Sequence, residues 1–233
     1  MRNKNNNEVK TIFNKISYKY DFLNSLLSLG LHKLWKKHLV DLLKPKNGEV
    51  WADLCCGTGD LAFLINEKVR PNGYVIGIDS AREILNIAKK RSKSVKTKII
   101  RWETKDILEI DEYLNKFDGI SMSYGLRNLA NVEEGIKKVF TLLNDKGRAG
   151  FLDFNHSRTN SLPHIFQKIY LRFIVVPISE IFLLSKEYAY IEKSIESFPE
   201  AKKLVLIAKE AGFKKVKYKP IFLNQMGILI VEK

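Results

Sequence analysis

The sequence predicts an α/β fold with a mostly parallel sheet, and two observations carry this prediction. Apolar runs typical of buried strands alternate with amphipathic stretches typical of helices between residues 50 and 154. The first run leads into a turn with two glycines, Gly57 and Gly59, and the second run ends at Asp79. Glycines let the backbone approach a ligand, and an acid about twenty residues further on can accept hydrogen bonds from ribose hydroxyls. The pattern therefore predicts a nucleoside-binding α/β unit.

The first elements are two or three amphipathic helices within residues 8–44. Apolar side chains recur there at helical spacing in two groups. The groups are Val9, Ile12, Phe13 and Ile16, and Leu31, Leu34, Trp35, Leu39, Leu42 and Leu43. A turn at residues 45–48 separates these helices from the alternating core.

The core is predicted as five strands connected by helical crossovers. The strands are Val50–Leu54, Tyr74–Ile78, Lys98–Trp102, Phe117–Met122 and Arg148–Phe154. The helices are Leu61–Val69, Arg82–Arg91 and Val132–Leu143. Because strands that alternate with helices need crossover connections, this part of the sheet is expected to be parallel.

Residues 155–198 interrupt that alternation. The stretch Leu162 to Leu184 is apolar, but prolines and charged residues break it. We expect a helical insertion packed on the sheet, or else a lid over a lipid-like substrate or a surface that rests on a membrane, and a lid could do both. The chain then closes with a helix at Ala201–Ala211 and two strands, Lys214–Lys219 and Met226–Val231, whose hairpin places one antiparallel strand in the sheet. The whole is one domain, with a helical cap (8–44), a cofactor-binding core (48–154), the insertion and a closing part (199–233).

The glycine pattern indicates which cofactor binds. A dinucleotide site has a third glycine, where this chain has Ala62, and a phosphate loop has Lys before Ser or Thr, where this chain has Asp60 and Leu61. An acid in the turn disfavours a phosphate but tolerates a cation. S-adenosylmethionine carries a sulfonium and an amino group without phosphate, so it fits this turn. The alternative is that the glycines form only a strand-to-helix turn.

Composition limits the partners. The chain has 31 lysines and 9 arginines against 26 acidic residues, a net charge of +14. This charge favours either a merely soluble basic surface or attraction to anionic lipid. The two cysteines are adjacent, so they form no intramolecular disulfide framework and lack zinc-ligand spacing. Neither a secretory signal nor an 18-residue apolar span is recognisable. We expect a cytoplasmic protein without metal or nucleic-acid partner, peripherally associated with a membrane.

Two further motifs carry a family resemblance. Phe13 to Asn24 with Leu27 to Lys36, and the segment Tyr124-Gly125-Leu126-Arg127-Asn128, resemble two signatures of the ubiquinone/menaquinone-type C-methyltransferases of quinone biosynthesis. The resemblance runs from about residue 8 to residue 233. It implies the class I S-adenosylmethionine-dependent methyltransferase fold, a Rossmann-like α/β fold with a mostly parallel seven-stranded sheet, N-terminal helices and a helical insertion before the last helix and strands.

Within that family the chain is similar to the cyanobacterial and plant-plastid branch. The segments that carry this similarity are Asp53–Gly57, Leu152–Asn155 and Met226–Leu229. Lys33 replaces the Arg usual there, and Asn155-His156-Ser157 replaces the Ser-Lys-Pro ending of many relatives. The branch methylates 2-phytyl-1,4-naphthoquinol, and the resemblance implies that the associated membrane is a thylakoid or plasma membrane.

The resemblance implies C-methylation of a reduced, prenylated naphthoquinol. The product is phylloquinol or, from demethylmenaquinol, menaquinol. Only the electron-rich quinol or its phenolate can attack a methyl group, and neither a metal nor a covalent enzyme intermediate is required. The alternatives are a benzoquinol of ubiquinone or plastoquinone type, an RNA methyltransferase, or a non-catalytic scaffold of quinone enzymes. The RNA alternative lacks the Asn/Asp-Pro-Pro-Tyr motif after the fourth strand, where Ser123-Tyr124-Gly125-Leu126 stands.

Candidate cofactor residues follow the strand ends. Gly57, Thr58 and Gly59 are expected at the methionine end, and Asp79 at the ribose hydroxyls. Asp106 matches the family position near the adenine amino group, with Ile107 beside it, and Ser123 closes the fourth strand.

Candidate catalytic residues lie around the same edge. Arg127 is expected to hold the quinol oxygen or to orient a water, and its alternative role is a salt bridge to an acid. Asp153 ends the fifth strand, and His156 is a candidate base near neutral pH. Tyr20, with Asp21, is expected to cap the site from the N-terminal helices. The length of the prenyl tail and any homo-oligomer stay open.

Overall fold

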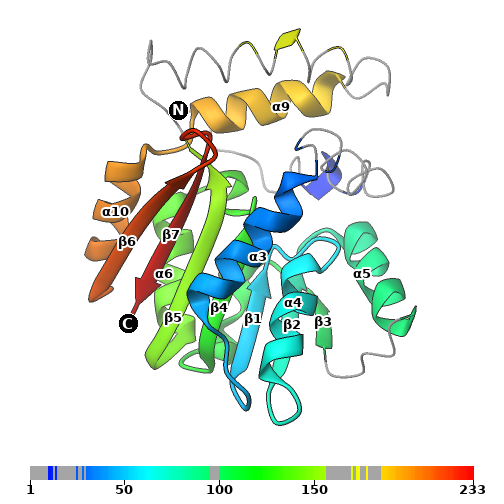
Figure 1. The fold of residues 1–233 in the computed structure, drawn as a ribbon, viewed down its shortest axis with the longest axis vertical. Coiled ribbons are helices and arrows are strands. Elements are labelled where there is room, and N and C mark those ends of the chain that lie inside the picture. The colour runs from blue at the N-terminus through cyan, green and yellow to red at the C-terminus, as the bar shows by residue number, and fades with distance from the viewer. Residues whose placement is uncertain are drawn as a thin grey trace.

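The computed structural model describes residues 10–12, 14, 25, 28, 30–94, 100–155, 169, 172–173, 177 and 185–233. They form a seven-stranded sheet with helices on both faces (Figure 1). The strands are β1 (Val50–Leu54), β2 (Tyr74–Asp79), β3 (Ile100–Thr104), β4 (Phe117–Ser123), β5 (Leu143–Phe154), β6 (Lys215–Ile221) and β7 (Met226–Glu232). The helices are α3 (Leu31–Leu43), α4 (Asp60–Val69), α5 (Arg82–Ser94), α6 (Val132–Leu142), α9 (Ser185–Glu196) and α10 (Ala201–Glu210), with short 3₁₀ turns η2 (Ile107–Glu109), η3 (Asp111–Tyr113) and η4 (Leu126–Asn128).

The strand order places a binding crevice at one position in the sheet. The order is β3-β2-β1-β4-β5-β7-β6. The pairs from β3 to β5 are parallel, and β7 runs antiparallel to both β5 and β6. The predicted single antiparallel strand in the closing hairpin is thus confirmed. Because the chain proceeds outward from β1 to β3 and then returns to start β4 beside β1, the order reverses between β1 and β4, where ligands bind in open α/β sheets.

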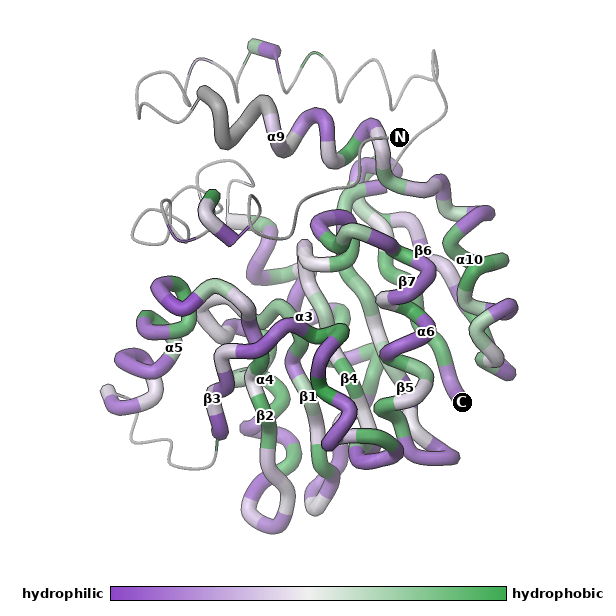
Figure 2. The backbone as a smooth tube through the Cα atoms, turned by 180° about the vertical axis from the view of Figure 1, so that it is seen from behind, coloured by the Kyte–Doolittle hydropathy of each residue, from purple (hydrophilic) through white to green (hydrophobic). Residues whose placement is uncertain are grey.

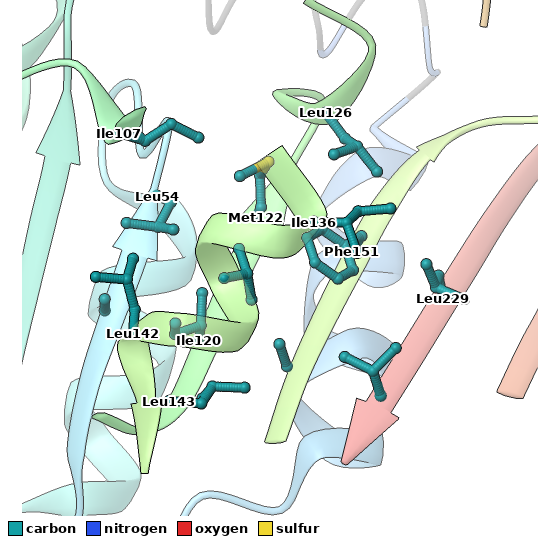
Figure 3. Packing of buried hydrophobic residues seen from close by; sticks show 14 of the residues in the cluster. Leu54, Ile107, Ile120, Met122, Leu126, Ile136, Leu142, Leu143, Phe151 and Leu229 are labelled. Atoms are coloured by element: carbon teal, nitrogen blue, oxygen red, sulfur yellow. The ribbon is translucent and has the colours of Figure 1, made fainter. Parts of the chain in front are cut away.

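Helices cover the two faces and bury a separate apolar cluster on each. In Figure 1, α3 and α4 lie in front of the sheet, and Figure 2 shows α6 and α10 on the opposite face. Leu39, Trp51, Leu61 and Ile65 are fully buried beneath α3 and α4. Figure 3 shows the other cluster, in which the side chains of β4, β5 and β7 meet those of α6. Each large apolar side chain contributes roughly 1.5–3 kcal/mol on burial, so the two clusters fix the sheet against its helices.

Several predicted boundaries differ from the structure. β5 begins at Leu143 rather than Arg148, because the segment before Arg148 stays extended beside β4 after a register shift between Phe117 and Gly119. β6 continues to Ile221, since Pro220 lies in an edge strand, where a missing N–H is tolerated. Residues 95–99, where the third strand was expected to start, lie outside the described residues.

The predicted apolar face of α3 is partly wrong. Leu34 is 61% exposed, whereas Lys36 is only 5% exposed. The helix turns His32, Lys36, Leu39, Val40 and Leu43 inward. A lysine can face inward here because its ammonium lies 2.9 Å from the carboxylate of Asp60.

Helix α9 lies across the carboxyl-terminal edge of the parallel strands (Figure 1). The Tyr190 hydroxyl donates to Asn128 Oδ1 at 3.2 Å, and Ser194 and Ile195 are buried. Of the preceding part of the predicted insertion, the structure describes only a few positions, among them the exposed Ile169 and Phe173. The lid over a lipid-like substrate therefore stays a prediction.

Among the described residues, no helix combines the length and apolar character that a membrane crossing requires.

Candidate functional site

A cavity of about 510 Å³ opens at the carboxyl ends of β1, β2 and β4. This is the position that the strand order indicates, and the volume lies in the usual range for small-ligand sites. Its lining comes from the segments that follow these strands and β3, and from Lys10 near the amino terminus. Among the lining residues are Cys55, Gly57, Asp79, Ala81, Asp106, Ile107, Ser123, Tyr124 and Asn128.

The carboxylate of Asp79 is fixed at the cavity by two backbone donors. The Gly57 N–H donates to Oδ2 and the Ala81 N–H donates to Oδ1, each at 2.8 Å. Burial raises the pKa of Asp79, and the two N–H donors oppose that rise. Each oxygen keeps a further lone pair, so the carboxylate can accept two hydroxyl groups on adjacent carbons. This geometry fits the ribose role expected from the spacing to Gly59.

The other two residues of the glycine turn, Thr58 and Gly59, contribute to its conformation and packing. Thr58 is 2% exposed, and its carbonyl accepts a hydrogen bond of 2.8 Å from Arg91. Gly59 has a φ of 88°, and a Cβ there would lie 2.4 Å from the Trp102 ring. Only Gly57 of the three lines the cavity. Gly59 is required by its backbone angle and by the tryptophan packed on it.

The acid of the turn does not face the ligand space. Asp60 pairs with Lys36 at 2.9 Å and with Arg91 at 2.8 Å. Burial alone would raise the pKa of Asp60, but the charges and hydrogen bonds of Lys36 and Arg91 hold it below its ordinary value. The turn disfavours phosphate for another reason: the Gly57 N–H, which a phosphate would need, already donates to Asp79.

Three predicted cofactor residues lie on the cavity wall. Asp106 caps η2 by accepting from the Leu108 N–H at 3.0 Å, which leaves its carboxylate beside the cavity. Ile107 is 3% exposed, and its side chain joins the core cluster near Leu54 (Figure 3). Ser123 ends β4 and lines the cavity. An acid beside an apolar wall can recognise an adenine through its amino group and its flat face.

Arg127 and Asp153 form a buried ion pair behind the cavity. Arg127 Nη1 donates to Asp153 Oδ1 at 2.7 Å, and the Arg127 backbone N–H donates to Oδ2 at 3.1 Å. Both side chains are at most 6% exposed. The salt bridge that the sequence left as the alternative role of Arg127 is present, and neither residue lines the cavity. A direct contact of Arg127 with a quinol oxygen stays a prediction.

Tyr124 is the residue through which this pair reaches the cavity, and sequence reasoning missed it as a site residue. Its φ of 59° is unusual for a residue other than glycine. Arg127 Nη1 and Asn128 Nδ2 donate to its carbonyl at 3.0 and 2.8 Å. Lys36 lies 5.7 Å from the centre of its ring. Its place directly after Ser123, at the carboxyl end of a strand, was the available signal.

Three residues considered in the sequence remain: Tyr20, His156 and Cys55. Tyr20 and His156 lie outside the described residues, so their roles stay predictions. Cys55, expected only to pack, also lines the cavity, and burial raises its thiol pKa well above the usual range. Across the described ranges, no three His, Cys, Asp or Glu side chains gather as metal ligands.

Asp53, which precedes the turn, should give the protein a pH-dependent stability. It is 1% exposed, accepts from Ser121 Oγ at 2.8 Å and from the Ala62 N–H at 3.0 Å, and burial raises its pKa to about 7. Between the usual pKa of 3.8 and this value, the unfolded chain releases the proton that the folded chain keeps. The contribution of Asp53 is therefore complete below the lower pKa and is lost as pH rises towards 7, on the order of 1 kcal/mol per pH unit.

We expect Asp53→Asn to remove this dependence, because the amide can accept from Ala62 and donate to Ser121. Urea unfolding of both proteins between about pH 4 and 7 measures the difference in slope. Equal slopes would mean that Asp53 is ionised in the folded protein.

Comparison with known proteins shows the family to which the chain belongs. It matches the ubiE/COQ5 methyltransferase family over residues 1–230. It is 39% identical over 228 residues to a Nostoc punctiforme protein named 2-phytyl-1,4-naphtoquinone methyltransferase, and the match covers 97% of this chain and 99% of the relative. It is 38% identical over 228 residues to the Arabidopsis thaliana protein named 2-phytyl-1,4-beta-naphthoquinone methyltransferase, chloroplastic, and covers 96% of this chain and 87% of that one.

Solved structures agree on the fold. A SAM-dependent methyltransferase from Aquifex aeolicus superposes with a TM-score of 0.61 at 14% identity, over 84% of this chain and 88% of that one. A Haemonchus contortus phosphoethanolamine N-methyltransferase in complex with S-adenosyl-L-methionine gives 0.66 at 13% identity, over 85% and 52%. The likeness confirms the predicted class I methyltransferase fold.

Proposed function

Because this chain belongs to the ubiE/COQ5 methyltransferase family and is an S-adenosylmethionine-dependent methyltransferase, we propose that it methylates a ring carbon of a reduced, prenylated naphthoquinol. The observation that carries this proposal is the similarity over nearly the full chain to relatives named as naphthoquinone methyltransferases. In the proposal, 2-phytyl-1,4-naphthoquinol is the first substrate to test and demethylmenaquinol the second. A benzoquinol is the alternative acceptor within the same chemistry.

The described residues offer groups suited to the cofactor half of such a reaction. S-adenosylmethionine, when bound, supplies a methyl group on a positively charged sulfur. We assign Asp79 to the ribose hydroxyls, Asp106 with Ile107 to the adenine, and Gly57 with Ser123 to the wall beside the methionine end. The cavity lining holds three carboxylates, Asp79, Asp106 and Glu109, against the two lysines Lys10 and Lys105, and this acidic excess favours a cationic ligand over a phosphate.

The acceptor side of the proposed site is built on Tyr124. Arg127 and Asn128 hold its carbonyl, and the buried Asp153 in turn holds Arg127. This arrangement keeps the turn after β4 in one conformation and so fixes the cavity wall. After the new carbon–carbon bond forms, the ring carbon must lose a proton, and His156 stays our candidate for the group that takes it, directly or through water.

The proposed partners are a membrane surface and further copies of the chain. A prenylated quinol resides in a bilayer, so we propose peripheral contact with a membrane surface, to which the net charge of +14 is suited. Association into a homo-oligomer stays a prediction that sedimentation of the purified chain can test.

The test of the proposal is transfer of labelled methyl groups from S-adenosylmethionine to demethylated naphthoquinone, with and without prior reduction. A benzoquinone and bulk tRNA serve as competing acceptors. We expect label only in the reduced naphthoquinol, because the oxidised ring is electron-poor and cannot attack the methyl group. Label in tRNA alone would contradict the proposal and favour an RNA methyltransferase. Binding of S-adenosylmethionine without transfer to any acceptor would favour the scaffold alternative.

A further inference from the structure

Two segments far apart in the chain form an exposed apolar surface. Trp35 of α3 lies against Phe222 in the turn between β6 and β7, with 5.1 Å between ring centres. Leu34, Phe222 and Leu223 are 61%, 43% and 75% exposed. We call the surface made by Leu34, Trp35, Phe222 and Leu223 the α3–turn patch. Large apolar side chains grouped in this way on a surface mark an interaction site more often than single ones do.

The backbone conformation of the turn keeps its apolar side chains exposed. Phe222, Leu223 and Asn224 have φ values of 48°, 51° and 65°, in the left-handed region that side chains other than glycine disfavour. The buried Asn155 clamps the turn: its Nδ2 lies 3.0 Å from the Asn224 carbonyl and 2.6 Å from Asn224 Oδ1. The Tyr218 hydroxyl donates to Asn155 Oδ1 at 2.7 Å. Such strain persists only where the surroundings enforce it, so the turn presents Phe222 and Leu223 in a fixed position.

Basic side chains surround the patch. Lys33 and Lys37 are exposed on α3, and Lys219 is exposed on β6, with its ammonium 3.1 Å from His38 Nε2. The single acid in α3 is Asp41, further along the helix. An apolar centre with a cationic rim matches an anionic bilayer, because the centre enters the interface while the lysines pair with lipid headgroups.

The patch also lies at the end of the molecule where the cavity opens. The β6–β7 turn and the amino-terminal end of α3 are at the edge of the sheet where β1 and β4 end (Figure 1), and the cavity opens at that same edge. We propose that the α3–turn patch docks this protein on anionic lipid bilayers and so brings the cavity towards a membrane-resident acceptor. The acceptor part rests on the proposed function, whereas the docking itself does not. A second copy is the less favoured occupant, since two such patches would bring lysines of like charge together.

The experiment measures binding of the full chain to phosphatidylcholine vesicles with and without added phosphatidylglycerol. We expect binding to the anionic vesicles that weakens with salt. Phe222→Ser with Leu223→Ser should lower the partition coefficient at least about tenfold, because the apolar contact is lost. Lys33→Glu with Lys37→Glu should lower it by at least about fivefold for each charge. The matched controls are Leu114→Ser, which is 49% exposed, and Lys116→Glu with Lys146→Glu, which are exposed elsewhere.

Two outcomes would overturn the docking proposal. One is a wild-type chain that ignores anionic vesicles, and the other is an equal loss of binding in patch variants and controls. If the wild type ignores vesicles and the patch variants change its sedimentation from dimer to monomer, the patch is an interface between copies.

Methylation of a naphthoquinol with a short, water-soluble side chain separates the two proposals. We expect the patch variants to keep wild-type turnover with this acceptor in the absence of vesicles, which also shows that they are folded. Vesicle binding without methylation of any quinol would contradict the proposed function and leave docking supported. Methylation without vesicle binding would support the proposed function and contradict docking.

Discussion

Replacement of Arg127 by alanine should lower the free energy of unfolding by about 3–5 kcal/mol, because it leaves the Asp153 carboxylate buried without its cation. Asp153 would keep two backbone donors, the N–H groups of residue 127 and Phe154. The carbonyl of Tyr124 would lose one of its two side-chain donors. We therefore expect turnover to fall as well, while S-adenosylmethionine affinity stays nearly intact. Urea unfolding, calorimetric binding and single-turnover rates on the same preparation measure the three quantities.

Arg148→Ala is the matched control for this prediction. Arg148 pairs with Glu49 at 2.8 Å, and both side chains are partly buried at the opposite edge of the sheet. It should destabilise the fold without lowering the turnover of the folded molecules. Arg127→Lys adds a second control, because lysine keeps the charge but lacks the planar guanidinium, whose Nη1 donates to both Asp153 and Tyr124. Wild-type turnover in folded Arg127→Ala would contradict any role of Arg127 at the quinol oxygen.

Asp79→Ala should raise the dissociation constant of S-adenosylmethionine at least about tenfold. Hydrogen bonds to a charged group contribute roughly 1.5–3 kcal/mol each, and the proposal assigns two of them to the ribose hydroxyls. The variant also frees the N–H groups of Gly57 and Ala81, so the turn itself loosens. Asp79→Asn, which keeps an acceptor, should lie between the wild type and Asp79→Ala. Titration calorimetry measures all three affinities.

The ribose assignment can be tested apart from this loosening. We expect removal of the 2′-hydroxyl from S-adenosylhomocysteine to weaken its binding to the wild type but not to Asp79→Ala. Glu109→Ala, which removes another carboxylate at the cavity, controls for the loss of negative charge. Equal sensitivity of wild type and Asp79→Ala to the 2′-hydroxyl would refute the assignment. Since burial raises the pKa of Asp79, affinity should also fall on acidification at a higher pH than for an exposed aspartate.

The sequence predicted the sheet well because its signal is local. Val50–Leu54 forms β1 with the expected bounds, and α4 and α6 differ from their predictions by one residue at one end. Apolar periodicity, glycine turns and helix ends depend on neighbours within a few positions, and a single chain displays them directly. The strand order follows less directly, because it depends on which crossover lies on which side of β1. Periodicity indicated seven strands, five in the core and two in the closing hairpin, and the family resemblance implied the same number.

The residues of the candidate site also differ in whether a local sequence signal could place them. Asp79 and Ser123 could be placed from the sequence because each ends a strand, and strand ends converge at one edge of a parallel sheet. Thr58 could not, since it is buried and does not line the cavity, and only the folded turn shows that. Tyr124 was missed because its importance comes from a left-handed backbone angle and from Arg127, which donates to its carbonyl and is itself held by the distant Asp153.

The chain by itself thus determined the class of fold, the place of the cofactor and the kind of chemistry, because those depend on short motifs and their spacing. Tertiary structure alone decided the roles of the charged and apolar groups that meet across long distances. It buried Lys36 against Asp60, paired Arg127 with Asp153, and left Leu34 exposed beside a turn nearly two hundred residues further on. The reason is physical: the state of a charge or an apolar side chain depends on its surroundings, and those are assembled only when the chain folds.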